Sequence, residues 1–198
     1  MRLGARIATG VVVAAAGMSA LFYVAFDETV AVEGGYSHHV DDLGGVTMWG
    51  VTEAVAREWG YRGEMRDMPR DTAAAIYHER YWQPLRGDDV GALYEDLALR
   101  LFDAGFNTGT YRAGAWLQRC LNVNNAQGSR YRDITVDGRV GAETLRALRS
   151  YAALRGGDGE DVLIECIQGL QVAHYVRISE ARGANETFTY GWLRRVRR

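Results

Sequence analysis

The feature that most constrains the fold is an uncharged run of twenty residues near the N-terminus, from Ile7 to Phe26. Its length matches the ~20 residues with which a helix crosses the hydrocarbon core of a bilayer. Arg2 and Arg6 precede the run, which predicts that the N-terminus stays in the cytoplasm while the remainder crosses the membrane. Half of the run is alanine, glycine, serine or threonine, so its transfer into lipid is only weakly favourable.

Three interpretations of this run remain open. It is a signal peptide cleaved at a small-residue site such as Ala14-Ala15-Ala16 or Ser19-Ala20, a permanent anchor, or a weakly held anchor that later leaves the bilayer. The many small residues favour the third interpretation. All three place the body of the protein beyond the cytoplasmic membrane.

Composition and charge exclude several classes of protein. A chain of 198 residues is long enough for one compact domain with an N-terminal extension. The net charge of −2 argues against a polybasic nucleic-acid binder, so we expect no nucleic-acid partner. Two cysteines are too few for a disulfide scaffold or a four-thiolate zinc site. We expect a monomer.

The body of the chain is predicted to be mainly α-helical, with a small non-helical or β lobe near its start. Thr52 has the character of an N-cap for a helix over 53–59 that ends at Gly60. The polar stretch 122–137 is the best internal boundary, so the predicted regions are 1–26, 27–122 and 123–198. Apolar spacing predicts the other helices over 27–33, 71–82, 90–106, 112–122, 142–154 and 160–182, followed by an aromatic and basic tail from Phe188.

The candidate catalytic residues lie in one window between Glu33 and Thr52. Glu33 follows Val30, Ala31 and Val32, and an apolar setting of this kind keeps a carboxyl group protonated. Asp41 and Asp42 lie in a glycine-rich loop, where water keeps carboxylates ionised. A protonated and an ionised carboxyl group together are what glycoside hydrolysis requires. On spacing alone, a solvated acidic turn is the competing interpretation.

The string E-G-G-Y followed by D-x-G-G-x-T-x-W-G-V-T resembles the signature of glycoside hydrolase family 108. The resemblance implies a lysozyme-like fold and N-acetylmuramidase activity on peptidoglycan glycan strands, without a cofactor or metal. The matching residues are Glu33, Gly34, Gly35 and Tyr36, followed by Asp42, Gly44, Gly45, Thr47, Trp49, Gly50, Val51 and Thr52.

The resemblance also implies roles for individual residues. Glu33 is the expected acid, and Asp42 and Thr47 are expected to position or activate water. Tyr36 and Trp49 are candidates for stacking on sugar faces, with burial in the core as the alternative. A further candidate is Asn107, which either hydrogen-bonds an acetamido group or caps a helix end.

Three later segments are also similar to this family. Residues 102–122 resemble its second helical block through Asp103, Asn107, Gly109, Leu117 and Gln118. Residues 137–148 and 191–196 resemble the C-terminal region that family members share, which is described as a predicted peptidoglycan-binding domain.

Two further groups of residues carry weaker signals. His38, His39, Asp41 and Asp42 could ligate a metal, but adjacent histidines in an extended segment point to opposite faces. Cys120 and Cys166 both fall in helical patterns, where a small buried residue is the ordinary interpretation. An oxidising periplasm would also allow a disulfide between them.

Together these features predict an endolysin that resembles the signal-anchor-release type, held first in the host inner membrane and then released into the periplasm. Only six residues separate Phe26 from Glu33, so a continuing helix places Glu33 roughly 10 Å beyond the hydrocarbon edge. A tethered form would therefore be inactive. The alternatives are a lytic transglycosylase, which uses Glu33 alone, and a non-catalytic peptidoglycan-binding envelope protein.

Overall fold

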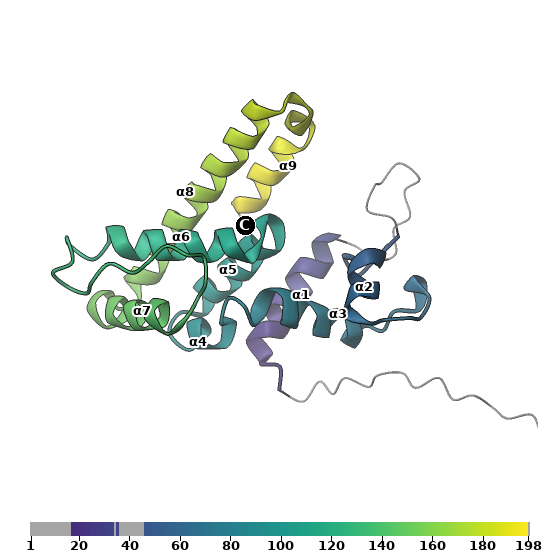
Figure 1. The fold of residues 1–198 in the computed structure, drawn as a ribbon, viewed down its shortest axis with the longest axis horizontal. Coiled ribbons are helices and arrows are strands. Elements are labelled where there is room, and N and C mark those ends of the chain that lie inside the picture. The colour runs from purple at the N-terminus through teal and green to yellow at the C-terminus, as the bar shows by residue number, and fades with distance from the viewer. Residues whose placement is uncertain (1–16, 34, 36–45, 198) are drawn as a thin grey trace, which may run out of the picture.

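The computed structural model describes residues 17–33, 35 and 46–197, which form a mainly helical fold with one small antiparallel sheet (Figure 1). The α-helices are α1 (Ala20–Glu33), α2 (Glu53–Trp59), α3 (Arg70–Tyr77), α4 (Gly87–Gly91), α5 (Glu95–Thr108), α6 (Thr110–Val123), α7 (Ala142–Arg155), α8 (Asp158–Ala181) and α9 (Glu186–Val196). The strands are β1 (Thr47–Met48) and β2 (Val51–Thr52), and the short helices are η1 (Met65–Asp67), η2 (His78–Trp82) and η3 (Gly183–Asn185).

The small lobe is a β-hairpin that leads directly into α2. Thr47 pairs with Thr52 and Met48 with Val51. The Thr52 side chain then accepts a hydrogen bond from the Val55 backbone N–H, which caps α2 as the sequence predicts. Gly60 ends α2 in the left-handed conformation, at φ 106°, which glycine adopts without strain.

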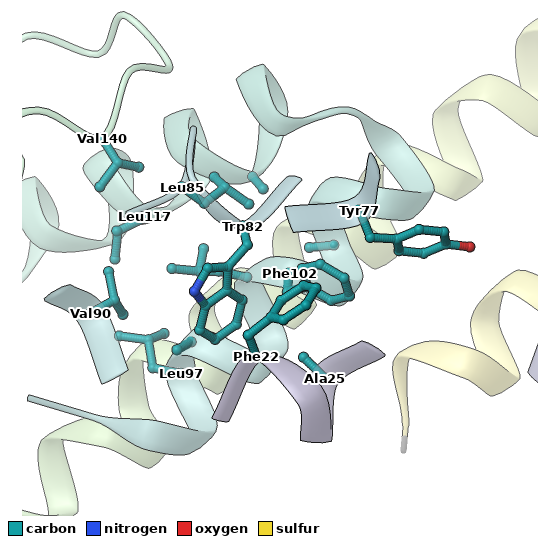
Figure 2. Packing of buried hydrophobic residues seen from close by; sticks show 14 of the residues in the cluster. Phe22, Ala25, Tyr77, Trp82, Leu85, Val90, Leu97, Phe102, Leu117 and Val140 are labelled. Carbon is teal, nitrogen blue, oxygen red and sulfur yellow. The ribbon is translucent and has the colours of Figure 1, made fainter. Parts of the chain in front are cut away.

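One face of helix α1 packs in the hydrophobic core. Phe22 and Phe26 are completely buried, and Ala25 is 3% exposed. The Phe22 ring meets the rings of Trp82 and Phe102 edge to face, with centroids 5.7 and 6.2 Å apart (Figure 2). This aromatic cluster fixes α1 against α5 and η2, because edge-to-face pairs add to the free energy gained by burial.

The expected hydrophobic helix over residues 7–26 is not supported. Residues 1–16 lie outside the described part of the chain, and α1 begins only at Ala20. Its apolar side chains at Phe22 and Phe26 pack inside the protein, where they cannot contact lipid. Among the described residues, no helix has both the length and the apolar character needed to cross a membrane.

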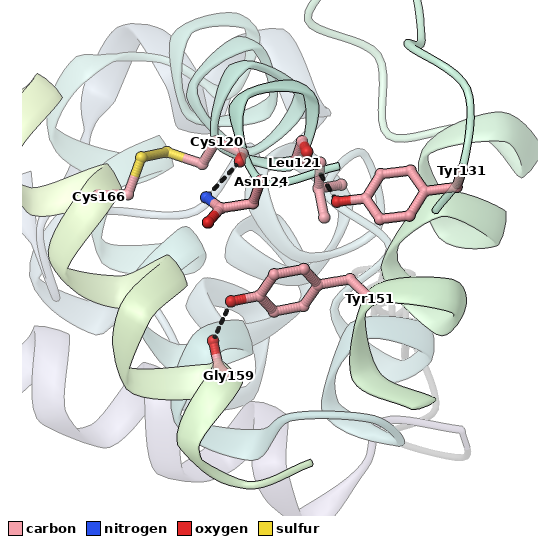
Figure 3. The surroundings of a disulfide bond; sticks show 7 residues. All are labelled: Cys120, Leu121, Asn124, Tyr131, Tyr151, Gly159 and Cys166. Carbon is pink, nitrogen blue, oxygen red and sulfur yellow. Dashed lines mark hydrogen bonds between the residues drawn. A yellow bond between two sulfur atoms is a disulfide. The ribbon is translucent and has the colours of Figure 1, made fainter. Parts of the chain in front are cut away.

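The C-terminal part is joined by a disulfide between Cys120 on α6 and Cys166 on α8 (Figure 3). The sequence left open whether these cysteines are small buried residues or form a disulfide, and in the structure they form a disulfide. Two tyrosine hydroxyl groups hold the neighbouring segments: Tyr131 donates to the Leu121 carbonyl and Tyr151 to the Gly159 carbonyl.

Two elements differ from the sequence prediction. The helix predicted over 90–106 is divided into α4 and α5, because Tyr94 between them is extended. The tail from Phe188 is part of a helix, α9, which runs beside the outer half of α8 (Figure 1). These two helices form a projection next to the end of α5.

Candidate functional site

Glu33 is the last residue of α1, and Arg70 holds the second half of this helix through two contacts. Asp27 forms an ion pair with Arg70 at the start of α3. The Arg70 guanidinium also lies over the Phe26 ring, 5.0 Å from its centroid. The backbone that carries Glu33 is therefore fixed to α3. The Glu33 side chain, and the whole of Tyr36 and Asp42, lie outside the described residues.

Thr47 is described, and it occupies the first position of β1. It is half-buried and lies opposite Thr52 in the hairpin. Trp49 and Gly50 form the two-residue turn with φ angles of 53° and 73°. Positive φ at both central positions is typical of a type I′ turn, which gives a tightly connected hairpin. Thr47 thus stands on a rigid element.

Trp49 joins the hairpin to the helical part of the protein. Its indole N–H donates to the Met68 carbonyl at 3.0 Å, and its own carbonyl accepts a hydrogen bond from the Tyr77 hydroxyl at 3.0 Å. The side chain is half-buried. These contacts give Trp49 a structural role, and stacking on a sugar face stays a prediction.

Asn107 lies in the last turn of α5. Its amide donates to the Asp103 carbonyl at 2.7 Å and to Asp103 Oδ1 at 3.2 Å. It also lines a cavity of about 390 Å³ at the side of α8 and α9. A contact with an acetamido group remains a prediction.

A larger cavity of about 700 Å³ lies between α1, α5, α8 and α9. On α1 it is bordered by Glu28 and Ala31, which are five and two residues before Glu33. Charged groups from the other helices line the remaining wall, among them Arg100, Asp103 and Arg195. The cavity wall is partly charged and partly apolar, and it lies beside the helix that ends at Glu33.

An ion pair that sequence reasoning did not identify crosses this cavity wall. Arg195 Nε on α9 lies 2.9 Å from Asp103 Oδ1 on α5, and Arg100 lies 3.8 Å from Asp103 Oδ2. The Arg195 guanidinium also lies over the Phe106 ring, 5.6 Å from its centroid. The i, i+3 spacing of Arg100 and Asp103 was a local signal, whereas the partner at Arg195 is 92 residues away.

No metal site emerges from the residues that the structure describes. Among them, no group of three or more histidine, cysteine, aspartate or glutamate side chains is arranged to hold an ion. The histidine and aspartate cluster at His38, His39, Asp41 and Asp42 lies outside the described residues.

Comparison with known proteins finds two family models that match successive parts of the chain. Residues 26–109 match the model described as glycosyl hydrolase 108, and residues 112–197 match a predicted peptidoglycan domain. No curated protein matches the sequence.

Among the solved structures that match is Brucella abortus SagA, with a TM-score of 0.65 and 28% sequence identity. The match covers 88% of each chain, so it includes both the helical core and the C-terminal helices. The protein thus carries a glycosyl hydrolase 108 domain followed by a predicted peptidoglycan domain, and it is a glycoside hydrolase that acts on peptidoglycan.

Proposed function

We propose that this protein is a lysozyme-like endolysin that hydrolyses the β-1,4 bond between N-acetylmuramic acid and N-acetylglucosamine and thereby lyses a phage-infected host cell. The observation that carries the proposal is the position of Glu33. It lies at the end of a helix whose other face is buried in the core, within the glycosyl hydrolase 108 match.

The proposed reaction uses an acid and a held water molecule. Glu33 donates its proton to the glycosidic oxygen as the bond from C1 to that oxygen breaks. Water held by Asp42 and Thr47 adds at C1 and gives up a proton to Asp42. This division of roles is supported by the rigid placement of the Glu33 backbone on α1 and of Thr47 on the hairpin.

The same proposal includes activation by release of the N-terminal segment. Phe22, Ala25 and Phe26 cannot lie in a bilayer and in the protein core at the same time. While residues 7–26 are held in the inner membrane, the core lacks these side chains and Glu33 is not fixed against α3. Release into the periplasm lets α1 pack and completes the site. An oxidising compartment also suits the disulfide between Cys120 and Cys166.

The chemical step is tested with Asp42→Asn and Glu33→Gln on purified peptidoglycan sacculi. A hydrolase creates a new reducing end at each cleavage, whereas a lytic transglycosylase forms an internal anhydro ring and uses no water. We expect the wild type to create reducing ends and both variants to lose that activity. Anhydro products from the wild type, with Asp42→Asn still active, would favour the transglycosylase.

Anchor release is tested in cells with residues Ala14, Ala15 and Ala16 replaced together. Three leucines make the segment more hydrophobic and should retain the protein in the membrane fraction and delay lysis. Three serines make it less hydrophobic and should advance both release and lysis. Identical fractionation and lysis times for the two triple variants and the wild type would refute the release step.

A further inference from the structure

The smaller cavity, of about 390 Å³, lies where the two matched regions meet. Asn107 on α5 belongs to the first region, and Arg112 on α6, Tyr175 on α8 and Trp192 on α9 belong to the second. Its volume falls within the range of about 300–1,000 Å³ that is typical of small-ligand sites.

One wall of this cavity is aromatic. The Trp192 ring stacks on Tyr175, with centroids 5.3 Å apart and an interplanar angle of 28°. Trp192 also stacks with Phe188, at 6.0 Å and 25°, and Phe188 is 58% exposed. The paired rings of Tyr175 and Trp192 give the cavity an apolar surface beside polar groups, which suits the apolar face of a hexosamine ring.

The cavity also has a cationic side. One guanidinium N–H of the exposed Arg112 donates to the Thr108 carbonyl at 2.6 Å, and arginine has further donors beyond that contact. His174, which also lines the cavity, has its pKa lowered by burial and by the charges of Arg112 and Arg177. Because His174 is neutral near neutral pH, Arg112 supplies the positive charge. None of the described lining residues is acidic.

The charge of the whole C-terminal region agrees with this local charge. Residues 112–197 carry 13 arginines and nine acidic side chains, whereas residues 26–109 carry seven arginines and 16 acidic side chains. An anionic ligand is therefore attracted to the C-terminal region and repelled by the N-terminal one.

The two cavities border the same two helices, α5 and α9. Asp103 and Arg195 line the larger cavity. Asn107 is one turn after Asp103 on α5, and Trp192 is one turn before Arg195 on α9. The first step is about 6 Å along α5 and the second about 4.5 Å along α9, so the two cavities are neighbours on the same pair of helices.

We propose that the smaller cavity binds an N-acetylmuramyl-peptide unit of the glycan strand, with a sugar ring against Trp192 and a stem-peptide carboxylate paired with Arg112. This inference rests on the proposed peptidoglycan substrate and identifies where the strand is held away from the bond that is cut. Arg112 distinguishes a peptide-bearing strand from bare glycan, because its guanidinium forms charge-assisted hydrogen bonds with a carboxylate.

The test measures binding of the full chain in a Glu33→Gln background, so that the ligand is not consumed. Intact sacculi are compared with sacculi from which an amidase has removed the stem peptides and whose newly exposed lactyl carboxylates have then been converted to neutral amides. Arg112→Gln should weaken binding to intact sacculi about tenfold and leave binding to stripped glycan unchanged. Arg119→Gln is the matched control, because Arg119 is an exposed arginine of the same helix that does not line the cavity, and it should bind both ligands normally.

Two results would overturn the inference. In one, Arg112→Gln binds intact sacculi as tightly as Arg119→Gln does. In the other, Arg112→Gln loses affinity equally for intact and stripped glycan, which would mean that Arg112 does not recognise the stem peptide.

The aromatic wall is tested separately with Trp192→Leu and Trp192→Tyr. The leucine should weaken binding to both forms of glycan, and the tyrosine, which keeps an aromatic face, should restore it. Equal binding by the folded leucine variant and the wild type would refute the sugar contact. Should the leucine variant fail to fold, the exposed Arg112 still decides the proposal.

Failure of this inference is distinguishable from failure of the proposed function. Cleavage of the same sacculi by the wild type tests the function alone. An inactive wild type whose binding still depends on Arg112 would refute the muramidase and support the cavity. An active wild type whose binding does not depend on Arg112 would support the muramidase and refute the proposed cavity site.

Discussion

Arg195 and Asp103 connect the last helix of the protein to its central helix. Their side chains are only 16% and 23% exposed, so the charges are largely removed from water. Loss of one member of a buried pair leaves the other charge poorly solvated, which costs more free energy than the pair itself contributes.

Arg195→Gln should therefore lower the free energy of unfolding by about 2 kcal/mol, less than for a fully buried pair because both groups keep some contact with water. The neighbouring Arg194→Gln is the matched control, since Arg194 is exposed and should have little effect. Urea denaturation measures both variants. Equal stability of the two would contradict a structural role for the ion pair.

Two histidines make the stability depend on pH. Burial lowers the pKa of His78 below its ordinary value of 6.5, although Asp88 opposes the shift. Burial, with Arg112 and Arg177, also lowers the pKa of His174. The unfolded chain therefore takes up protons at a higher pH than the folded protein does, and protonation favours unfolding.

The free energy of unfolding should be fully retained at about pH 7.5 and should decrease as the pH falls through about 6.5. His174→Gln removes one of the two groups, so this variant should lose less stability than the wild type between about pH 7.5 and 5.5. Urea titrations at the two pH values compare them. A wild-type stability that rises on acidification over this range would contradict the assignment.

Helix α1 has two roles, because its last residue is Glu33 and its apolar side chains fill part of the core. Deleting a buried phenylalanine side chain typically costs about 3–5 kcal/mol, and whole domains are stable by only about 5–15 kcal/mol. A chain that begins at Asp27 lacks both Phe22 and Phe26 and should not fold. A chain that begins at Gly17 keeps the entire helix and should fold.

Circular dichroism melting and limited proteolysis compare the two truncated chains. A cooperative transition is expected only for the longer one. If the chain beginning at Asp27 melted at the same temperature, residues 20–26 would be dispensable for the fold.

Local signals predicted some elements closely. Thr52 and Gly60 bracket α2 as expected, because an N-cap and a left-handed C-terminal glycine act within a single turn. Other elements depend on contacts between residues that are far apart in the sequence, and the break between α4 and α5 is an example. The Tyr94 hydroxyl donates to the Gly156 carbonyl, 62 residues away, and the extended Tyr94 interrupts an otherwise continuous apolar stripe.

In the candidate site, too, local signals determine some features and long-range contacts determine others. The helix predicted over 27–33 ends at Glu33, where Gly34 and Gly35 follow, and α1 ends at the same residue. The tail from Phe188 becomes helical through contacts with α8, such as the Asn185 amide that donates to the Ile178 carbonyl. Neither this contact nor the pairing of Arg195 with Asp103 can be derived from spacing along the chain.

At the scale of the whole molecule, the disulfide joins α6 to α8 across 46 residues. A loop of this length is strongly restricted in the unfolded chain. Replacing Cys120 and Cys166 together with alanine should lower the free energy of unfolding by about 2–4 kcal/mol. Guanidinium denaturation measures the change, and a reducing agent should destabilise the wild type similarly without affecting the double variant. Equal stability of the oxidised wild type and the double variant would contradict this role.

Glu33 is the proposed acid of this peptidoglycan hydrolase. Its role is measured by the release of soluble muropeptides from purified sacculi by the chain that begins at Gly17. The wild type and Glu143→Gln, a control at an exposed glutamate on α7, should solubilise the sacculi, whereas a folded Glu33→Gln should not. Equal release by Glu33→Gln and Glu143→Gln would contradict the account.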